Sequence, residues 1–149
     1  MKALATCLAS IALAAAPALA GPSKFAPPNA TYQNECGSCH LAYPGQLLSV
    51  ASWRALLAGL DKHFGTDATV DQAAMKEISA YLERSARAPR KGEGIAPQIT
   101  QARWFVREHD EVPTTTWMLP AVKSKANCGA CHTRAEQGDF SEASLPVPE

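Results

Sequence analysis

The sequence predicts a mostly α-helical protein without a substantial sheet, built from two small helical modules. Three observations support this fold class. The pattern Cys-x-x-Cys-His occurs twice, at residues 36–40 and 128–132, once in each half of the chain. Apolar residues recur at helical spacing between the two copies, and no alternating strand pattern is visible. Residues 87–97, rich in proline, glycine and positive charge, are expected to link the two modules.

The first twenty residues are expected to form a cleaved export signal. Lys2 supplies a positive start, an apolar run rich in alanine and leucine follows, and Ala18-Leu19-Ala20 fits the small-residue cleavage pattern. The run is shorter than the roughly 20 residues that a membrane-spanning helix needs. We therefore expect a mature chain that begins at Gly21 and resides in the periplasm, with no transmembrane segment.

The first module is expected to span residues 31–86, after an extended, proline-containing lead-in at residues 21–30. Its first helix covers residues 31–42 and ends in the first Cys-x-x-Cys-His copy. A second helix is predicted from an N-cap at Ser52 through Phe64, where Gly65 stops it. A third helix, capped by Asp71, extends to about Ala86.

The second module is expected to span residues 98–149 and to contain the second Cys-x-x-Cys-His copy. Thr100 is predicted to cap a helix that ends at His109, since Pro113 limits any continuation. Residues 123–137 should form a short helical segment around the motif, and the acidic tail from Asp139 should lie along the surface. The basic linker is better explained as a solvated loop than as a docking patch.

Cys-x-x-Cys-His is the attachment signature of a c-type haem. Its two thiols bond to the haem vinyl groups, and the histidine that follows becomes the proximal iron ligand. Two disulfides or a four-cysteine zinc site would use the same cysteines, but neither explains the histidine after each pair. The predicted cofactors are two haem c groups, held by Cys36, Cys39, Cys128 and Cys131, with His40 and His132 as proximal ligands.

The size and charge of the chain restrict its function further. Halves this small have little core of their own, so the porphyrins should supply apolar volume and the protein without haem should be largely unfolded. The formal net charge is +0 at pH 7, which argues against nucleic acid as a partner.

The chain has four histidines, and the two outside the motifs are His63 and His109. A six-coordinate haem needs a second axial ligand, usually His or Met. Each of these histidines lies at the end of a predicted apolar helix face, so we expect both to be distal ligands. Local pairing assigns His63 to the iron of His40 and His109 to the iron of His132. A crossed pairing, with the two inner ligands exchanged, stays open.

Methionine is the rival distal ligand. Met118 lies in a loop segment upstream of the second motif and is the alternative to His109 at the second haem. A thioether ligand would raise the reduction potential of that haem. Met75 is a weaker candidate, because it shares its helical spacing with residues expected in the core.

Several motifs together carry a family resemblance. They are Cys36 to His40 followed by Leu41-Ala42-Tyr43-Pro44, Ser52-Trp53, His63-Phe64-Gly65, Trp104-Phe105 with His109, and Asn127 to His132 with Ala135, Gly138 and Phe140. In these the chain resembles the small periplasmic dihaem cytochrome c family of proteobacteria, over essentially the whole mature chain. The resemblance implies a low-potential, bis-histidine electron carrier. It also implies a membrane cytochrome b as electron donor and a high-spin, oxygen-binding monohaem cytochrome as acceptor.

Four histidines for four axial positions leave no iron site for a substrate. The sequence therefore favours outer-sphere electron transfer between redox proteins over enzymatic activity. The alternative is a haem enzyme, such as a peroxidase or reductase, or a gas sensor. Either would need one labile distal ligand.

Overall fold

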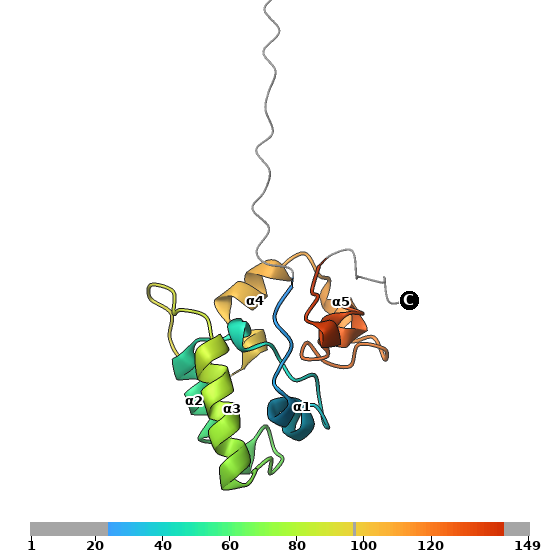
Figure 1. Cartoon of the computed structure of the whole chain (residues 1–149). Helices are drawn as coiled ribbons and strands as arrows, with labels where there is room; N and C mark the ends of the chain where they lie inside the picture. Colours follow the sequence, from blue (N-terminus) through green and yellow to red (C-terminus); the bar gives the residue numbers. More distant parts are fainter. Residues whose placement is uncertain (1–23, 97, 142–149) are drawn as a thin grey trace, which may run out of the picture.

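The computed structural model describes residues 24–96 and 98–141, so the predicted export signal and the end of the acidic tail lie outside the described residues (Figure 1). The α-helices are α1 (Ala30–Cys36), α2 (Val50–Leu57), α3 (Gln72–Ser85), α4 (Arg103–Glu108) and α5 (Thr114–Trp117). Short 3₁₀ helices lie between and after them: η1 (Gly45–Leu47), η2 (Leu60–Lys62), η3 (Ile99–Gln101), η4 (Cys128–Ala130) and η5 (Ala135–Gln137). Isolated bridges are the only β-pairing in the described part of the chain. The predicted mostly α fold is confirmed. None of the helices in this part is long and apolar enough to cross a membrane.

Helix α3 begins where the sequence predicts. The Asp71 side chain accepts a hydrogen bond from the backbone N–H of Ala74 at 2.8 Å, which satisfies one of the free donors of the first turn. Ala74, Ile78 and Leu82 recur at helical spacing and are all buried. This helix packs against α1, α2 and η1 and is the centre of the first half of the molecule.

The predicted N-cap of the preceding helix, α2, is wrong by about one turn. Ser49, not Ser52, is the N-cap of α2, and its hydroxyl accepts a hydrogen bond from the Ser52 N–H at 3.4 Å. Ser52 is buried instead, and its hydroxyl accepts a hydrogen bond from the N–H of Ala96 at 2.9 Å. Two serines spaced by three are both suitable caps. Ser52 instead accepts the hydrogen bond from Ala96, which lies 44 residues further along the chain.

Four predicted helical segments are shorter than expected. The first, predicted over residues 31–42, ends at Cys36, and the segment predicted over residues 123–137 is helical only in η4 and η5. Helix α2 ends at Leu57, and the chain reaches His63 through Gly59 and the turn η2, so the continuous helix to Phe64 is wrong. Thr100 lies inside η3 and caps nothing. The N-cap of α4 is the buried Ala102, which has an extended conformation and makes no side-chain capping hydrogen bond. Burial of Ala102 therefore decides that boundary, which no cap signal marks.

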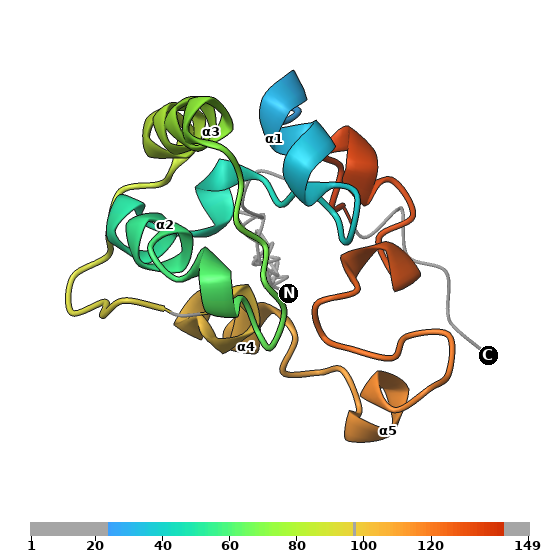
Figure 2. The same cartoon turned by 90° about the horizontal axis from the view of Figure 1, so that it is seen from below.

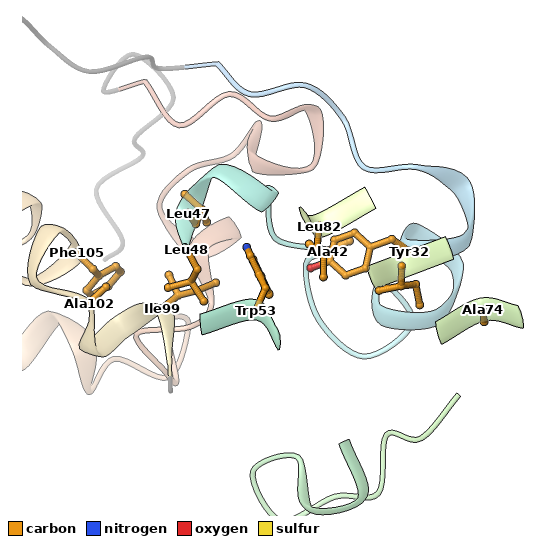
Figure 3. Close-up of a cluster of buried hydrophobic side chains, with 11 residues drawn as sticks. Tyr32, Ala42, Leu47, Leu48, Trp53, Ala74, Leu82, Ile99, Ala102 and Phe105 are labelled. Atoms are coloured by element: carbon orange, nitrogen blue, oxygen red, sulfur yellow. The ribbon is translucent and has the colours of Figure 1, made fainter. Parts of the chain in front are cut away.

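A row of buried apolar side chains connects the two halves of the chain. Figure 3 shows Phe105, Ala102 and Ile99 at one end, Leu47, Leu48 and Trp53 in the middle, and Ala42, Tyr32, Leu82 and Ala74 towards the other end. Leu48 and Leu82 are completely buried. Burying one such side chain stabilises the fold by roughly 1.5–3 kcal/mol. The core thus draws on residues from both sides of the predicted linker, and the division into two modules stays a prediction.

Two tryptophans fix the turn η1 within this core. The indole N–H of Trp53 donates to the carbonyl of Gly45 at 2.7 Å, and that of Trp104 donates to the carbonyl of Leu47 at 2.9 Å. The second bond joins residues 57 positions apart. Gly45 lies so close to Ser85, at the end of α3, that a Cβ would overlap its side chain. The turn therefore contacts α2, α3 and the α4 region together.

The linker is held by an ion pair between Arg87 and Glu93. Both side chains are largely shielded, and Glu93 also accepts a hydrogen bond from the N–H of Arg90 at 2.9 Å. The Arg87 guanidinium lowers the pKa of Glu93 to about 2. Together with the Ala96–Ser52 hydrogen bond, this pair closes residues 87–96 into a loop on the first half of the molecule. Figures 1 and 2 show this loop beside α2 and α3.

The N-terminal segment is bound to the C-terminal segment. The N–H of Phe25 donates to the carbonyl of Gly138 at 2.8 Å, and the Phe25 and Phe140 rings meet edge to face. The Asp139 carboxylate pairs with Arg134 at 2.9 Å and with Lys24 at 3.8 Å. Asp139 is buried, so the expected surface position is wrong for the start of the tail. The described part of the lead-in, residues 24–29, contains no helix and packs against residues 138–140 before α1 begins.

We predict that Glu93→Gln lowers stability above pH about 4.5 and leaves it nearly unchanged at pH 2. The depressed pKa of Glu93 means that its contribution is complete above the unfolded pKa and is lost as the pH falls towards about 2. Denaturant unfolding across this pH range measures the difference. Glu83→Gln is the control, because Glu83 pairs with Arg54 on the surface and exposed pairs contribute little. Equal losses in the two variants would contradict a special role for the linker pair.

We predict that Gly138→Ala destabilises the protein more than Gly92→Ala. Both glycines have positive φ, 74° and 72°, so both substitutions incur the left-handed penalty of roughly 1–2 kcal/mol. A Cβ at Gly92 meets nothing within 4 Å, whereas one at Gly138 would overlap the Phe25 carbonyl oxygen. The difference in free energy of unfolding between the variants measures the N-terminal contact. Equal values would show that the segment moves aside without cost.

Candidate haem sites

The first site brings the imidazole rings of His40 and His63 together. Their ring centroids are 6.1 Å apart and the ring planes differ by 28°. His40 follows α1 and the first Cys-x-x-Cys turn, while His63 follows η2. The backbone turns sharply after His63, because Phe64 and Gly65 both have positive φ, and this turn closes with a hydrogen bond from Thr66 N–H to the His63 carbonyl at 3.0 Å.

The second site brings His109 and His132 together. Their ring centroids are 6.2 Å apart and the planes are nearly perpendicular, at 85°. His109 is the C-cap of α4, at the end of the helix as predicted, and His132 follows η4. The structure therefore places the histidines in the two local pairs. His63 lies with His40 and His109 with His132, rather than in the crossed arrangement.

The four motif cysteines precede the two motif histidines, and none of the four forms a disulfide. Cys36 is the last residue of α1 and Cys128 is the first residue of η4, so each motif folds as a tight turn. In both motifs the N–H of the histidine donates to the carbonyl of the first cysteine, at 3.4 Å from His40 and 2.8 Å from His132. This turn places each histidine next to its own cysteine pair.

The spacing of each pair fits a metal ion between two imidazoles. Metal–imidazole bonds of about 2 Å, as found for zinc, separate two opposed ring centroids by roughly 6 Å. Both observed separations, 6.1 Å and 6.2 Å, agree with this value. Burial, and then the neighbouring His40, lower the pKa of His63. Burial, and then His109, likewise lower the pKa of His132. A neutral imidazole is the form that binds a metal.

Three of the four imidazole rings are oriented by contacts with neighbouring groups. Nδ1 of His40 lies 2.7 Å from the Leu41 carbonyl oxygen, and Nδ1 of His109 lies 2.9 Å from the Phe105 carbonyl oxygen. An Nδ1–H that donates to a carbonyl leaves the lone pair of Nε2 for a metal. Nδ1 of His132 is buried without a hydrogen-bond partner, and its ring is held by contact with Phe140 at 5.4 Å.

Aromatic side chains line the second site. The ring of Phe105 stacks on His109 at 4.1 Å, and Trp117 lies 5.9 Å from the same imidazole. These residues, with Val106, Val112 and others, border a cavity of about 210 Å³ next to His109. The sequence did not mark Trp117 as part of the site. Its helix, α5, is a single turn that begins after Pro113, where the sequence only predicted an end to the preceding helix.

Met118, the rival ligand, has 77% of its surface exposed. His109, rather than Met118, is the side chain that faces His132. Across residues 24–96 and 98–141, no three His, Cys, Asp or Glu side chains gather closely enough to hold a bare metal ion. The two cysteine pairs therefore belong to separate sites and do not form the four-cysteine zinc cluster that the spacing alone allowed.

Two separate Cys-x-x-Cys-His turns, each with a second imidazole opposite its histidine, define a c-type cytochrome with two haems. A comparison with protein families agrees: the model of the family "Dihaem cytochrome c" matches residues 32–140. The chain belongs to the dihaem cytochrome c family. It is accordingly a haem protein of electron transfer that carries two c-type haems.

Solved structures of the same kind are similar over most of the chain. A dihaem cytochrome c from Shewanella baltica OS155 has 40% sequence identity and a TM-score of 0.71, covering 80% of this chain and 93% of its own. A dihaem cytochrome c from Rhodobacter sphaeroides has 36% identity and a TM-score of 0.70, covering 78% and 99%. A search of the curated proteins gave no significant match.

Proposed function

We propose that this protein is a periplasmic electron carrier in which both haem irons have two histidine ligands. The observation that carries the proposal is the pair of opposed imidazoles at each site, 6.1 Å and 6.2 Å apart. Cys36 and Cys39 would hold the first haem, with His40 and His63 as axial ligands. The second haem would be held by Cys128 and Cys131, with His132 and His109 as axial ligands.

A bound haem would supply one-electron chemistry, in which iron alternates between its ferrous and ferric states. The task of this chain is then to hold the iron and to exclude other ligands. Two imidazoles would occupy both axial positions of each iron, which would leave no open position for oxygen, peroxide or a substrate. Imidazole in place of a thioether keeps the reduction potential low. Transfer is outer-sphere, since no bond to iron needs to form or break.

The partners that fit this function are other redox proteins. We propose a membrane cytochrome b as donor and a high-spin monohaem cytochrome c as acceptor, in line with the family resemblance. The loop before the second motif carries exposed Lys123 and Lys125, and the ammonium of Lys125 lies 5.5 Å from the Trp117 ring centroid. This loop is a suitable docking point for an acidic partner, because exposed positive charges beside a redox site steer association.

Optical and EPR spectra of the purified protein test the ligation. We expect two low-spin haems in both oxidation states and no binding of CO. Because the imidazole planes are near-parallel at the first site and near-perpendicular at the second, the two ferric signals should differ in shape, the second having the larger maximal g value. A high-spin component or CO binding would instead favour an enzyme or gas sensor with a labile distal ligand.

Single substitutions assign the ligands. His63→Ala should convert only the signal with near-parallel planes to high spin, and His109→Ala only the other, because each site loses one of its two imidazoles. The Met118→Leu variant is the control and should keep both low-spin signals, since the methionine is exposed. Loss of low spin in Met118→Leu, or of both signals in either histidine variant, would contradict the proposed ligands.

A further inference from the structure

Tyr43 has its ring against the motif histidine of the first haem site and its hydroxyl against the loop that leads into the second motif. The ring stacks on the imidazole of His40, with centroids 4.9 Å apart and planes inclined by 19°. Its backbone carbonyl accepts a hydrogen bond from the buried Tyr32 at 3.1 Å. The position of the ring relative to His40 is therefore fixed from the core of the first half.

The hydroxyl of Tyr43 reaches the loop that carries the second motif. It donates to the carbonyl of Ala126 at 2.8 Å, a contact that joins residues 83 positions apart. The same carbonyl oxygen lies 3.7 Å from Sγ of Cys128. The loop is braced at this point by Asn127, whose side-chain amide donates to the carbonyl of Val122 at 3.0 Å. One side chain thus spans from the proximal histidine of the first site to the first cysteine of the second.

We propose that Tyr43 couples the two haem sites and thereby speeds electron exchange between them. The inference rests on the proposed function, because it takes His40 as an iron ligand and Cys128 as a haem attachment. A contiguous series of ring contact, covalent bonds and one hydrogen bond couples two sites better than a gap does. The series runs from the His40 imidazole through the Tyr43 ring and hydroxyl to the Ala126 carbonyl and the Cys128 sulfur.

Other aromatic residues near the histidines each contact one site. Phe64 lies against His63, while Trp117 and Phe140 lie against His109 and His132. The indoles of Trp53 and Trp104 are directed at the turn η1 through their N–H groups. Tyr43 differs from all of these because its two ends contact two different sites.

The exchange itself is a balanced one-electron step. One iron is oxidised from ferrous to ferric as the other is reduced from ferric to ferrous, so no external oxidant or reductant is consumed. Tyr43 keeps its electrons and its proton throughout. Its part is to position the His40 ring and the loop of Cys128 and to fill the space between them.

The test uses Tyr43→Phe, which keeps the ring on His40 and removes only the hydroxyl that reaches Ala126. In half-reduced holoprotein, exchange spectroscopy of the haem methyl resonances measures how fast the electron moves between the two haems. A rate that does not depend on protein concentration is intramolecular. We expect this rate to fall several-fold, up to about tenfold, while both reduction potentials and both low-spin EPR signals stay as in the wild type.

Tyr81→Phe is the matched control, because the buried Tyr81 hydroxyl has no hydrogen-bond partner. Its exchange rate should equal that of the wild type. Tyr43→Gln is a second variant, which removes the ring as well; it should slow exchange and change the EPR signal of the first haem. An unchanged rate in Tyr43→Phe, or equal slowing in Tyr81→Phe, would overturn the coupling role. Wild-type spectra without two low-spin haems would instead refute the proposed function.

Discussion

The second haem site sets the main constraint on this fold, because the polypeptide buries little apolar surface of its own there. Between residues 106 and 134 the only buried side chain is Val122. Helix α5 is a single turn, and η4 and η5 are 3₁₀ turns of three residues each. Such short elements do not bury enough surface to offset their conformational entropy. A porphyrin attached at Cys128 and Cys131 would supply buried apolar surface in a region where the chain buries little of its own.

Long-range contacts serve the same need. The core row in Figure 3 draws Ile99, Ala102 and Phe105 of the second half onto Leu48 and Trp53 of the first. Phe25, near the start of the described chain, packs on Phe140 and Gly138 at the other end. Tyr43 adds a third connection, to the loop before Cys128. Each half is therefore stabilised by contacts with the other, and these contacts connect the two haem sites.

Local chemistry made part of this structure predictable from the sequence. The Cys-x-x-Cys-His motif sets its own turn, so His40 and His132 could be located without knowledge of the rest. Asp71 caps α3 because the cap and the helix are adjacent in the chain. The count of four histidines for two haems pointed to His63 and His109, and the structure places each of them opposite a motif histidine.

Long-range contacts made the remainder unpredictable. Ser49 and Ser52 are equally good caps, and a hydrogen bond from Ala96, which the local pattern does not contain, separates their roles. Likewise, the sequence alone assigns Asp139 to an acidic surface tail, whereas in the structure it forms ion pairs with Lys24 and Arg134. Helical periodicity placed His63 on a continuous helix, but the chain reaches it through Gly59 and a 3₁₀ turn. The predicted helix was therefore wrong at His63, although His63 does lie beside His40.

The order of the sites along the chain has a structural consequence. In the first site the motif precedes its opposing histidine, and in the second the histidine precedes the motif. Both opposing histidines therefore come from the middle of the chain, and both motifs lie towards its ends. When the ends return to one another, through Phe25 and Phe140 and through Tyr43 and Ala126, the loops that carry the motifs become neighbours. A tandem repeat of one module would instead follow the first opposing histidine directly with the second motif. The reversed order brings together the two segments to which the haems are attached, and these segments meet at the Tyr43 hydrogen bond.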